Sequence, residues 1–286
     1  MNSKRDLLKR LLNLFPTKLL KEHFKEKGNS EDVIEAITGN NRSNFIVDFV
    51  FNNYNSTRQN IYLFDLDKNF NRNVIDNTFP LAIEKEILLN QEYTLLCLPQ
   101  TEFSVYLSNP TAKEDLFFLQ PVHIIIHKKS LVLIFTKLEK NVHTYFPEIR
   151  EAKKASVKND EEETLKKILT FFGMHYSVTP TNFNKGIKQL WHKDEIDCYK
   201  IQWRNPHSTS SETMDGTLTF KQKYPTEYLK IVQTQLSKSV WKYLLTDDYL
   251  CEGFTADPSN GEISITKFPK LPNQVKNVIT KILTNN

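Results

Sequence analysis

Glycine is scarce in this chain, which has seven glycines among 286 residues. The closest two, Gly253 and Gly261, stand eight positions apart. A dinucleotide-binding fingerprint needs glycines two and three positions apart, a Walker A loop needs them five apart, and a nucleophile elbow needs Gly-x-Ser-x-Gly. The sequence therefore excludes the enzyme classes that depend on these three motifs.

Cysteine and long apolar runs are also lacking. The three cysteines, Cys97, Cys198 and Cys251, lie too far apart for a zinc-knuckle pair, and three cannot all pair within one chain. No apolar run reaches the roughly 18 residues of a membrane span. Lys9 and Arg10 interrupt the first apolar segment, which is unlike a signal peptide. We expect a soluble, intracellular protein from a reducing compartment, with no membrane partner and no cofactor.

Positive charge is concentrated at the amino terminus. The formal net charge of the chain is +4, whereas residues 1–30 carry eight basic and three acidic residues, a net +5. A local basic surface of this kind favours a polyanionic partner. The alternative interpretation is a solvated, lysine-rich helix face that binds nothing.

Apolar residues at helical spacing predict a small helical bundle at the amino terminus. The first helix covers residues 3–15, and Pro16 ends it and opens the second. Gly28 is the expected left-handed stop of the second helix, and Ser30 and Ser43 are the expected N-caps of a third and a fourth.

Alternation of apolar and polar residues replaces the helical pattern after the bundle. The runs rich in β-formers are Tyr93–Leu98, Phe103–Leu107, Val122–His127 and Leu131–Thr136. They predict a mainly antiparallel sheet in the middle of the chain. Residues 148–163 are highly charged and are interpreted as a seam between subdomains.

The last third of the sequence predicts a smaller α+β unit with helices on a sheet. Its expected elements are a strand at Cys198–Arg204, a strand at Thr217–Lys223, a helix at Thr226–Gln235, a second helix near Trp241 and a strand at Glu262–Phe268. The whole chain is thus predicted to be α+β, with a helical bundle in residues 1–58, a β-rich central domain in 59–147, the seam, and the carboxy-terminal unit in 164–286.

Two groups of residues resemble metal or nuclease sites, and each has a simpler interpretation. His123 and His127 share one strand face, but zinc needs a third ligand, so a pair of half-exposed strand histidines is favoured. A second group precedes a lysine, as in the acidic core of some nucleases, and consists of Asp194, Glu195, Asp197 and Lys200. The spacing is wrong for such a core, and a charged turn before a strand explains these residues.

Most aromatic residues stand at core spacing, but three in the tail are candidates for an interface. Tyr199 and Trp203 lie on one expected strand and Phe220 on the next. Tyr199 and Trp203 would form either a stacking surface for single-stranded nucleic acid or, together with Phe220, a sheet edge for a partner protein.

The segment DLLKRLLNLFPTKLL, from Asp6 to Leu20, resembles the start of the centromere protein N family of inner-kinetochore subunits. Three later segments are similar to others of that family: RQNIYLFDL from Arg58, DCYKIQWRN from Asp197 and LTFKQKYPTEYLKIV from Leu218. The resemblance implies a pyrin-type or death-fold-like helical domain, a mainly β central region and a carboxy-terminal α+β unit.

What the resemblance implies is a non-enzymatic adaptor in the nucleus, at the centromere. The helical domain would bind the centromeric nucleosome and duplex DNA, and the carboxy-terminal unit would pair with a subunit like centromere protein L. By position, Asp6 would face the centromeric histone, and Lys9 and Arg10 would face DNA.

This sequence departs from the family's pattern at two places. Leu14 stands where the family can carry a lysine, and the third helix lacks the family's basic cluster. The expected DNA-binding set therefore also includes Lys4, Arg5, Lys18 and Lys21. Two alternatives stay open: a death-fold-like protein-interaction adaptor that does not bind DNA, and a nuclease.

Overall fold

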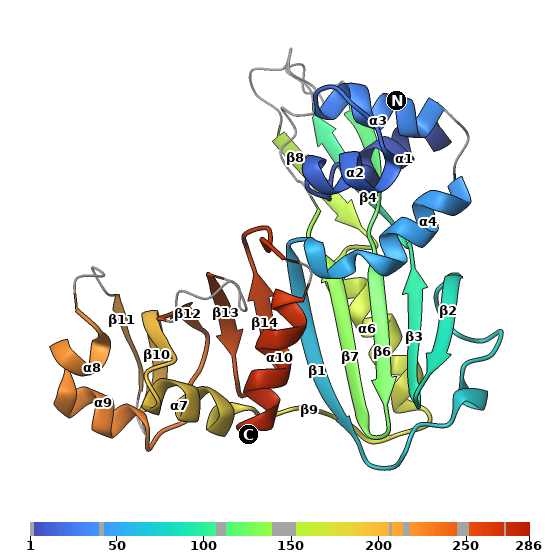
Figure 1. Ribbon diagram of the computed structural model, residues 1–286. Helices are drawn as coiled ribbons and strands as arrows, with labels where there is room; N and C mark the ends of the chain where they lie inside the picture. The colour runs from blue at the N-terminus through green and yellow to red at the C-terminus, as the bar shows by residue number, and fades with distance from the viewer. Residues whose placement is uncertain are drawn as a thin grey trace. The chain divides into compact units, whose positions relative to one another are not determined.

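The computed structural model describes residues 3–39, 43–106, 113–138, 153–205, 208–213, 218–244, 252–271 and 273–286. Within them the chain combines α-helices with antiparallel β-sheets (Figure 1), which confirms the predicted α+β class. No helix in these ranges has both the length and the apolar character needed to cross a bilayer.

The chain divides into two compact units, which are described separately. Unit 1 comprises Met1–Thr57, Asp67–Lys129 and Phe135–Val178, and unit 2 comprises Arg58–Leu66, Ser130–Ile134 and Thr179–Asn286.

Unit 1 contains five α-helices and two small sheets in its described residues. The helices are α1 (Lys4–Leu12), α2 (Thr17–Phe24), α3 (Ser30–Gly39), α4 (Ser43–Asn52) and α6 (Glu161–Gly173), with 3-10 turns η1 (Tyr54–Ser56) and η2 (Arg72–Val74). One sheet has the order β6-β3-β2 (Val122–His127, Glu92–Cys97, Ile83–Leu89), and the other has the order β5-β4-β8 (Lys113–Leu119, Gln100–Tyr106, Lys153–Lys158). The predicted order of element types, short helices followed by β-strands, is present in these residues.

Local caps set the limits of the bundle's helices. Ser3 and Asp6 form a capping box at the start of α1, in which each side chain accepts a hydrogen bond from the other's backbone. Lys25, with φ of 58°, is the left-handed residue after α2, so Gly28 is not the stop. The Asn29 side chain accepts from the amides of Glu31 and Asp32, so Asn29, and not Ser30, caps α3.

The four bundle helices share their core with the β5-β4-β8 sheet. Leu11, Leu12 and Phe49 are fully buried, and they belong to one apolar cluster with Phe103 of β4 and Phe118 of β5. Side chains of the strands thus complete the core of the four short helices. The bundle therefore folds as part of unit 1.

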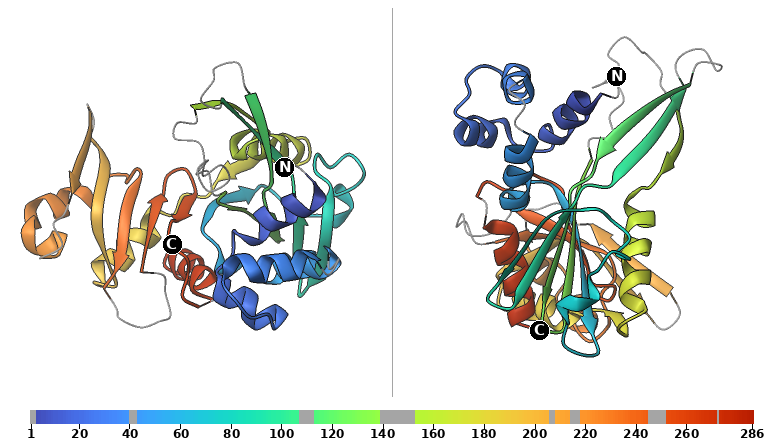
Figure 2. Two further views of the ribbon diagram at one scale, coloured as in Figure 1. Left: turned by 90° about the horizontal axis from the view of Figure 1, so that it is seen from above. Right: turned by 90° about the vertical axis from the view of Figure 1, so that its right-hand side faces the viewer.

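The β6-β3-β2 sheet lies between two helices of unit 1, with α4 on one face and α6 on the other (Figure 2). His123 of β6 pairs across the strands with Leu96 of β3, and its ring stacks on Tyr54 with centroids 4.5 Å apart. On α6, Phe171 contacts the Phe79 ring edge-on at 5.0 Å.

Part of the expected charged seam has regular structure. In its described portion, β8 pairs with β4, and α6 begins at Glu161 with Asp160 as its N-cap. Val157 of β8 packs against the bundle core, so this strand has an apolar contact that its many charges conceal in the sequence. Residues 148–152 of the seam lie outside the described residues.

Unit 2 is an antiparallel sheet with helices packed on it. Its strands follow the order β11 (Ser208–Thr213), β10 (Ile196–Asn205), β12 (Ser239–Tyr243), β13 (Gly253–Asp257), β14 (Glu262–Ile265), β1 (Gln59–Leu66) and β7 (Ser130–Thr136, of which Ser130–Ile134 belong to this unit), and β9 (Val178–Pro180) also pairs with β1. Its helices are α7 (Asn184–His192), α8 (Phe220–Lys223), α9 (Pro225–Ile231) and α10 (Gln274–Thr284), and Figure 1 shows α10 in front of β14 and β1.

An aromatic cluster around Trp191 of α7 forms the core under these helices. Its ring centroid lies 4.7 Å from that of Tyr228 on α9 and 5.4 Å from those of Phe220 on α8 and Trp241 on β12. One tryptophan thus ties three further elements of unit 2 together.

Four predictions for this tail are wrong or too long, and one of them is the strand at Glu262–Phe268, since β14 ends at Ile265. Instead of a strand at Thr217–Lys223, the described part forms α8, which Thr219 opens with a capping box to Gln222. Trp241 lies in the strand β12 and not in a helix, because Ser239 and Trp241 are buried and Val240 between them is not. The α9 helix ends at Ile231, before the predicted Gln235.

Gly186 permits the close approach of α7 to α10. A Cβ atom at this position would lie 2.2 Å from the Ile282 carbonyl oxygen, so only hydrogen fits. Gly173, at the end of α6, is a natural comparison because a Cβ there would meet nothing within 4 Å.

We predict opposite effects of Gly186→Ala and Gly173→Ala on stability. The first variant must push α7 away from α10 and lowers the free energy of unfolding by about 1–3 kcal/mol. The second relieves the entropy cost of a helical glycine and raises it by up to about 1 kcal/mol. Urea denaturation measures both, and equal values for the two variants would contradict the packing of α7 on α10.

The two histidines of β6 do not form the half-exposed pair that the sequence favours. His123 is fully buried and His127 is exposed. Burial lowers the pKa of His123 to about 3. The unfolded chain, in which a histidine has a pKa near 6.5, therefore binds a proton that the folded chain refuses between these two values.

We predict that acidification destabilises unit 1 through His123. The free energy of unfolding falls by as much as about 1.4 kcal/mol per pH unit as the pH drops below about 6.5. Urea denaturation at pH 7.0, 6.0 and 5.0 measures this slope. His123→Phe should flatten it, whereas His127→Gln, at the exposed position, should leave it unchanged. A wild-type slope retained by His123→Phe would assign the effect to another group.

Candidate functional site

The basic residues of the amino-terminal bundle are the sequence's main functional candidates, and the structure divides them into paired and free groups. In α1, Arg5 and Lys9 both bond to the carboxylate of Glu35 on α3, with Arg5 Nη2 at 2.7 Å. The hydrogen bond from Lys9 is the main cause that lowers the pKa of Glu35. Glu35 therefore offsets part of the positive charge of α1.

Arg10 is a core residue and not a surface cation. It is 7% exposed, its guanidinium donates to the Phe117 carbonyl oxygen of β5 at 2.6 Å, and it lies over the Phe118 ring at 5.4 Å. The expectation that Arg10 faces DNA is therefore wrong. Helical periodicity placed it beside the apolar stripe, but only the strand β5 shows that the stripe's edge is buried too.

Asp6 lies at the start of α1 and acts there as a capping residue. Its Oδ2 accepts hydrogen bonds from Ser3 Oγ at 2.8 Å and from the Ser3 amide at 3.1 Å. The bond from the Ser3 hydroxyl is the main cause that lowers the pKa of Asp6. The carboxylate is thus held ionised at the amino-terminal end of the helix, where the helix dipole favours it.

Three lysines of the bundle lie on α2 or directly after it. Lys18 and Lys21 stand at i and i+3 on one side of α2, and Lys25 is the exposed left-handed residue that follows the helix; the three are here called the α2 lysine face. Lys18 has a side chain 88% exposed and approaches only Glu22, at 3.9 Å. An exposed pair at this distance contributes little, so the face keeps a net positive charge.

The predicted interface residues of the tail are not brought together on one surface. Tyr199 of β10 is 50% exposed, whereas Phe220 is 1% exposed in the cluster around Trp191. The side chain of Trp203 lies outside the described residues. Phe220 is therefore a core residue, and β10 is an inner strand because it pairs with both β11 and β12.

The acidic group before Lys200 does not converge. Asp194 pairs with Lys221 at 2.7 Å, Glu195 with Lys281 at 2.5 Å, and Asp197 accepts from the Phe220 amide at 3.1 Å. In the part of the chain that the structure describes, no three His, Cys, Asp or Glu residues are grouped as a metal site. These carboxylates serve the packing of α7, α8 and α10.

Two features of the surface escaped the sequence analysis. Lys25 belongs to the α2 lysine face, and its place a few residues after Lys18 and Lys21 was a signal available in the sequence. The second feature, a groove between α7 and α9, could not be predicted from the sequence, because it depends on how these two helices of unit 2 pack.

Compared with models of known protein families, the sequence matches none, and compared with curated proteins it gives no match. The function must therefore be inferred from the geometry of the bundle and from the resemblance at the amino terminus.

We predict that Lys9 and Arg10, adjacent in sequence, differ sharply when replaced by alanine. Arg10→Ala leaves the Phe117 carbonyl without its donor and lowers the free energy of unfolding by about 2 kcal/mol. Lys9→Ala removes one partly exposed ion pair and lowers it by less than about 1 kcal/mol. Urea denaturation distinguishes them, and an Arg10→Ala variant as stable as the wild type would show that its guanidinium is not part of the core.

Proposed function

We propose that the helical bundle binds duplex DNA through the α2 lysine face and that the chain is a non-enzymatic adaptor. The observation that carries the proposal is the grouping of Lys18 and Lys21 on one side of α2 with the exposed Lys25 at its end, where Glu22 is the ion-pair partner found within the described residues. At a rise of 1.5 Å per residue, α2 extends about 9 Å from Lys18 to Phe24, which is about three phosphate steps of 3.4 Å measured along the DNA axis.

Phosphate contacts suit this surface better than base recognition does. Lysine is a flexible point charge that binds phosphates without reading sequence. The α2 helix also has its own core-facing residues, Leu20 and Phe24, so its charged side is free for a ligand. Binding of this kind is independent of DNA sequence and is sensitive to salt.

The resemblance to the centromere protein N family supports a more specific version of the proposal. In that version the bundle is of pyrin or death-fold type and docks on the centromeric nucleosome in the nucleus. The carboxy-terminal unit then pairs with a subunit like centromere protein L. The paired state of Arg5 and Lys9 and the burial of Arg10 favour α2 over α1 as the helix that meets DNA.

A second candidate function, protein recruitment without DNA, rests on the same bundle. An acidic helix of another death-fold-like domain would also bind a lysine face. The two functions differ in the partner that occupies this surface. Duplex DNA displaces an acidic protein from the chain only if both partners bind to α2.

We predict that replacing the three lysines of the α2 lysine face by glutamine weakens binding to a 30-base-pair duplex at every sequence. Each lost phosphate contact lowers the slope of log K against log salt by about 0.9, so the triple variant loses up to about 2.7 units of slope. Fluorescence anisotropy at four salt concentrations measures it.

A matched control replaces Lys230, Lys238 and Lys276, exposed lysines of unit 2, by glutamine. It removes the same charge and should keep the wild-type slope. Equal slopes for the two triple variants would reduce the effect to net charge, and no measurable duplex binding by the wild type would favour the protein-recruiting adaptor.

A further inference from the structure

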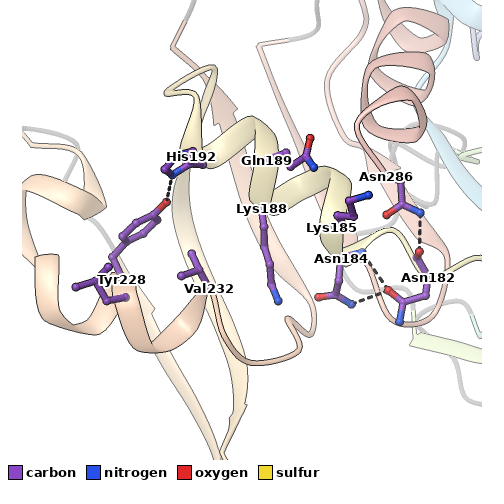
Figure 3. A pocket seen from close by; sticks show the side chains of 10 residues that line it. Asn182, Asn184, Lys185, Lys188, Gln189, His192, Tyr228, Val232 and Asn286 are labelled. Carbon is purple, nitrogen blue, oxygen red and sulfur yellow. Dashed lines mark hydrogen bonds between the residues drawn. The ribbon is translucent and has the colours of Figure 1, made fainter.

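Unit 2 has a surface groove of about 820 Å³ between α7 and α9. Figure 3 shows the side chains around it, with Lys188 projecting from α7 between Asn184 and Val232, the residue that follows α9. His192 and Tyr228 lie at one end of the groove, where Nδ1 of His192 is 3.4 Å from the hydroxyl oxygen of Tyr228. The groove plays no part in the function proposed for the bundle.

The α9 wall of the groove is apolar. Tyr228 and Ile231 turn into the aromatic core of unit 2, with 9% and 0% exposure. Leu229 and Val232 lie on the groove side, and Leu229 is 62% exposed. The apolar surface of α9 is therefore wider than its own core needs, and part of it faces solvent in a concave site.

The α7 wall of the groove is cationic. Lys185 and Lys188 line it, and neither makes an ion pair or a hydrogen bond within the described residues. Lys188 is half-buried, and this burial lowers its pKa. No Asp or Glu is among the residues that line the groove. A carboxylate supplied by a ligand would restore a partner to a partly desolvated ammonium group.

We propose that this groove is a docking site for an acidic amphipathic helix of a partner protein. Leucine-type side chains of that helix contact Leu229 and Val232, and its carboxylates pair with Lys185 and Lys188. The α7 wall has nine residues and is about 13 Å long, which accommodates about two to three turns of a bound helix. A wall residue as exposed as Leu229 suits an open groove for a helix better than an enclosed pocket for a small ligand.

Selection from a random 16-residue peptide library displayed on phage, against the immobilised full chain, tests the occupant. Enriched sequences should carry Leu, Ile, Met or Phe at i, i+3 or i+4 and i+7, together with an excess of Asp and Glu. The most enriched peptide is then synthesised with a fluorescent label, and its dissociation constant is measured by anisotropy.

Two groove variants and two matched controls locate the binding. Leu229→Ser and Lys188→Gln should each raise the dissociation constant of the peptide by at least about fivefold. Leu271→Ser and Lys230→Gln change an exposed leucine and an exposed lysine that do not line the groove, and they should bind as the wild type does. Thermal melting verifies that all four variants are folded.

The proposal is overturned if no peptide is enriched, if the enriched peptides have no excess of acidic residues, or if the groove variants bind them with unchanged affinity. It is also overturned if dodecanoate, an apolar carboxylate, binds to the chain and this binding is weakened by Leu229→Ser and Lys188→Gln, whereas no peptide binds. None of these outcomes depends on DNA binding by the bundle, so the two proposals fail separately.

Discussion

The bundle's dependence on strands β4 and β5 for its core determines most of what unit 1 presents to solvent. Short helices leave an apolar core open on one side, and Phe103 and Phe118 close it. This closure brings β5 against α1, so that Arg10 is covered by the strand and bonds to its carbonyl group. A residue at the rim of a helix's apolar stripe is exposed in an isolated bundle and buried in this one.

Because of the same packing, the positive charge that the bundle presents to a ligand is smaller than the formal charge of its residues. All of the excess positive charge of the chain belongs to residues 1–30, but Glu35 of α3 pairs with Arg5 and Lys9 and neutralises part of α1. In the part of the chain that the structure describes, Lys18 of α2 pairs only with Glu22, at 3.9 Å. A polyanion therefore meets a smaller surface than the sequence suggests, and the surface lies on a different helix from the one that the family resemblance indicates.

Unit 2 uses α7 in two ways. Its inner side carries Trp191 into the aromatic core, and Gly186 lets it approach α10 to backbone contact. Its outer side carries Lys185 and Lys188 into a groove whose other wall is apolar. Because the inner side fixes the position of α7, the groove is a consequence of core packing, and its chemistry depends on the few residues that remain outside.

The sequence by itself determined the short helices of the bundle, the β-rich middle and the location of the charge excess. These features follow from local periodicity, capping and composition, which a short segment expresses without its neighbours. The secondary structure predicted from the sequence was wrong for the segment around Phe220 and for Trp241, because an aromatic-rich run is compatible with both a strand and a buried helix. Only the tertiary structure decided that Arg10 is core, that Glu35 pairs with α1 and that α7 and α9 enclose a groove. Each of these depends on residues more than 25 positions apart in the chain, and no local pattern records which distant segment will cover a given face.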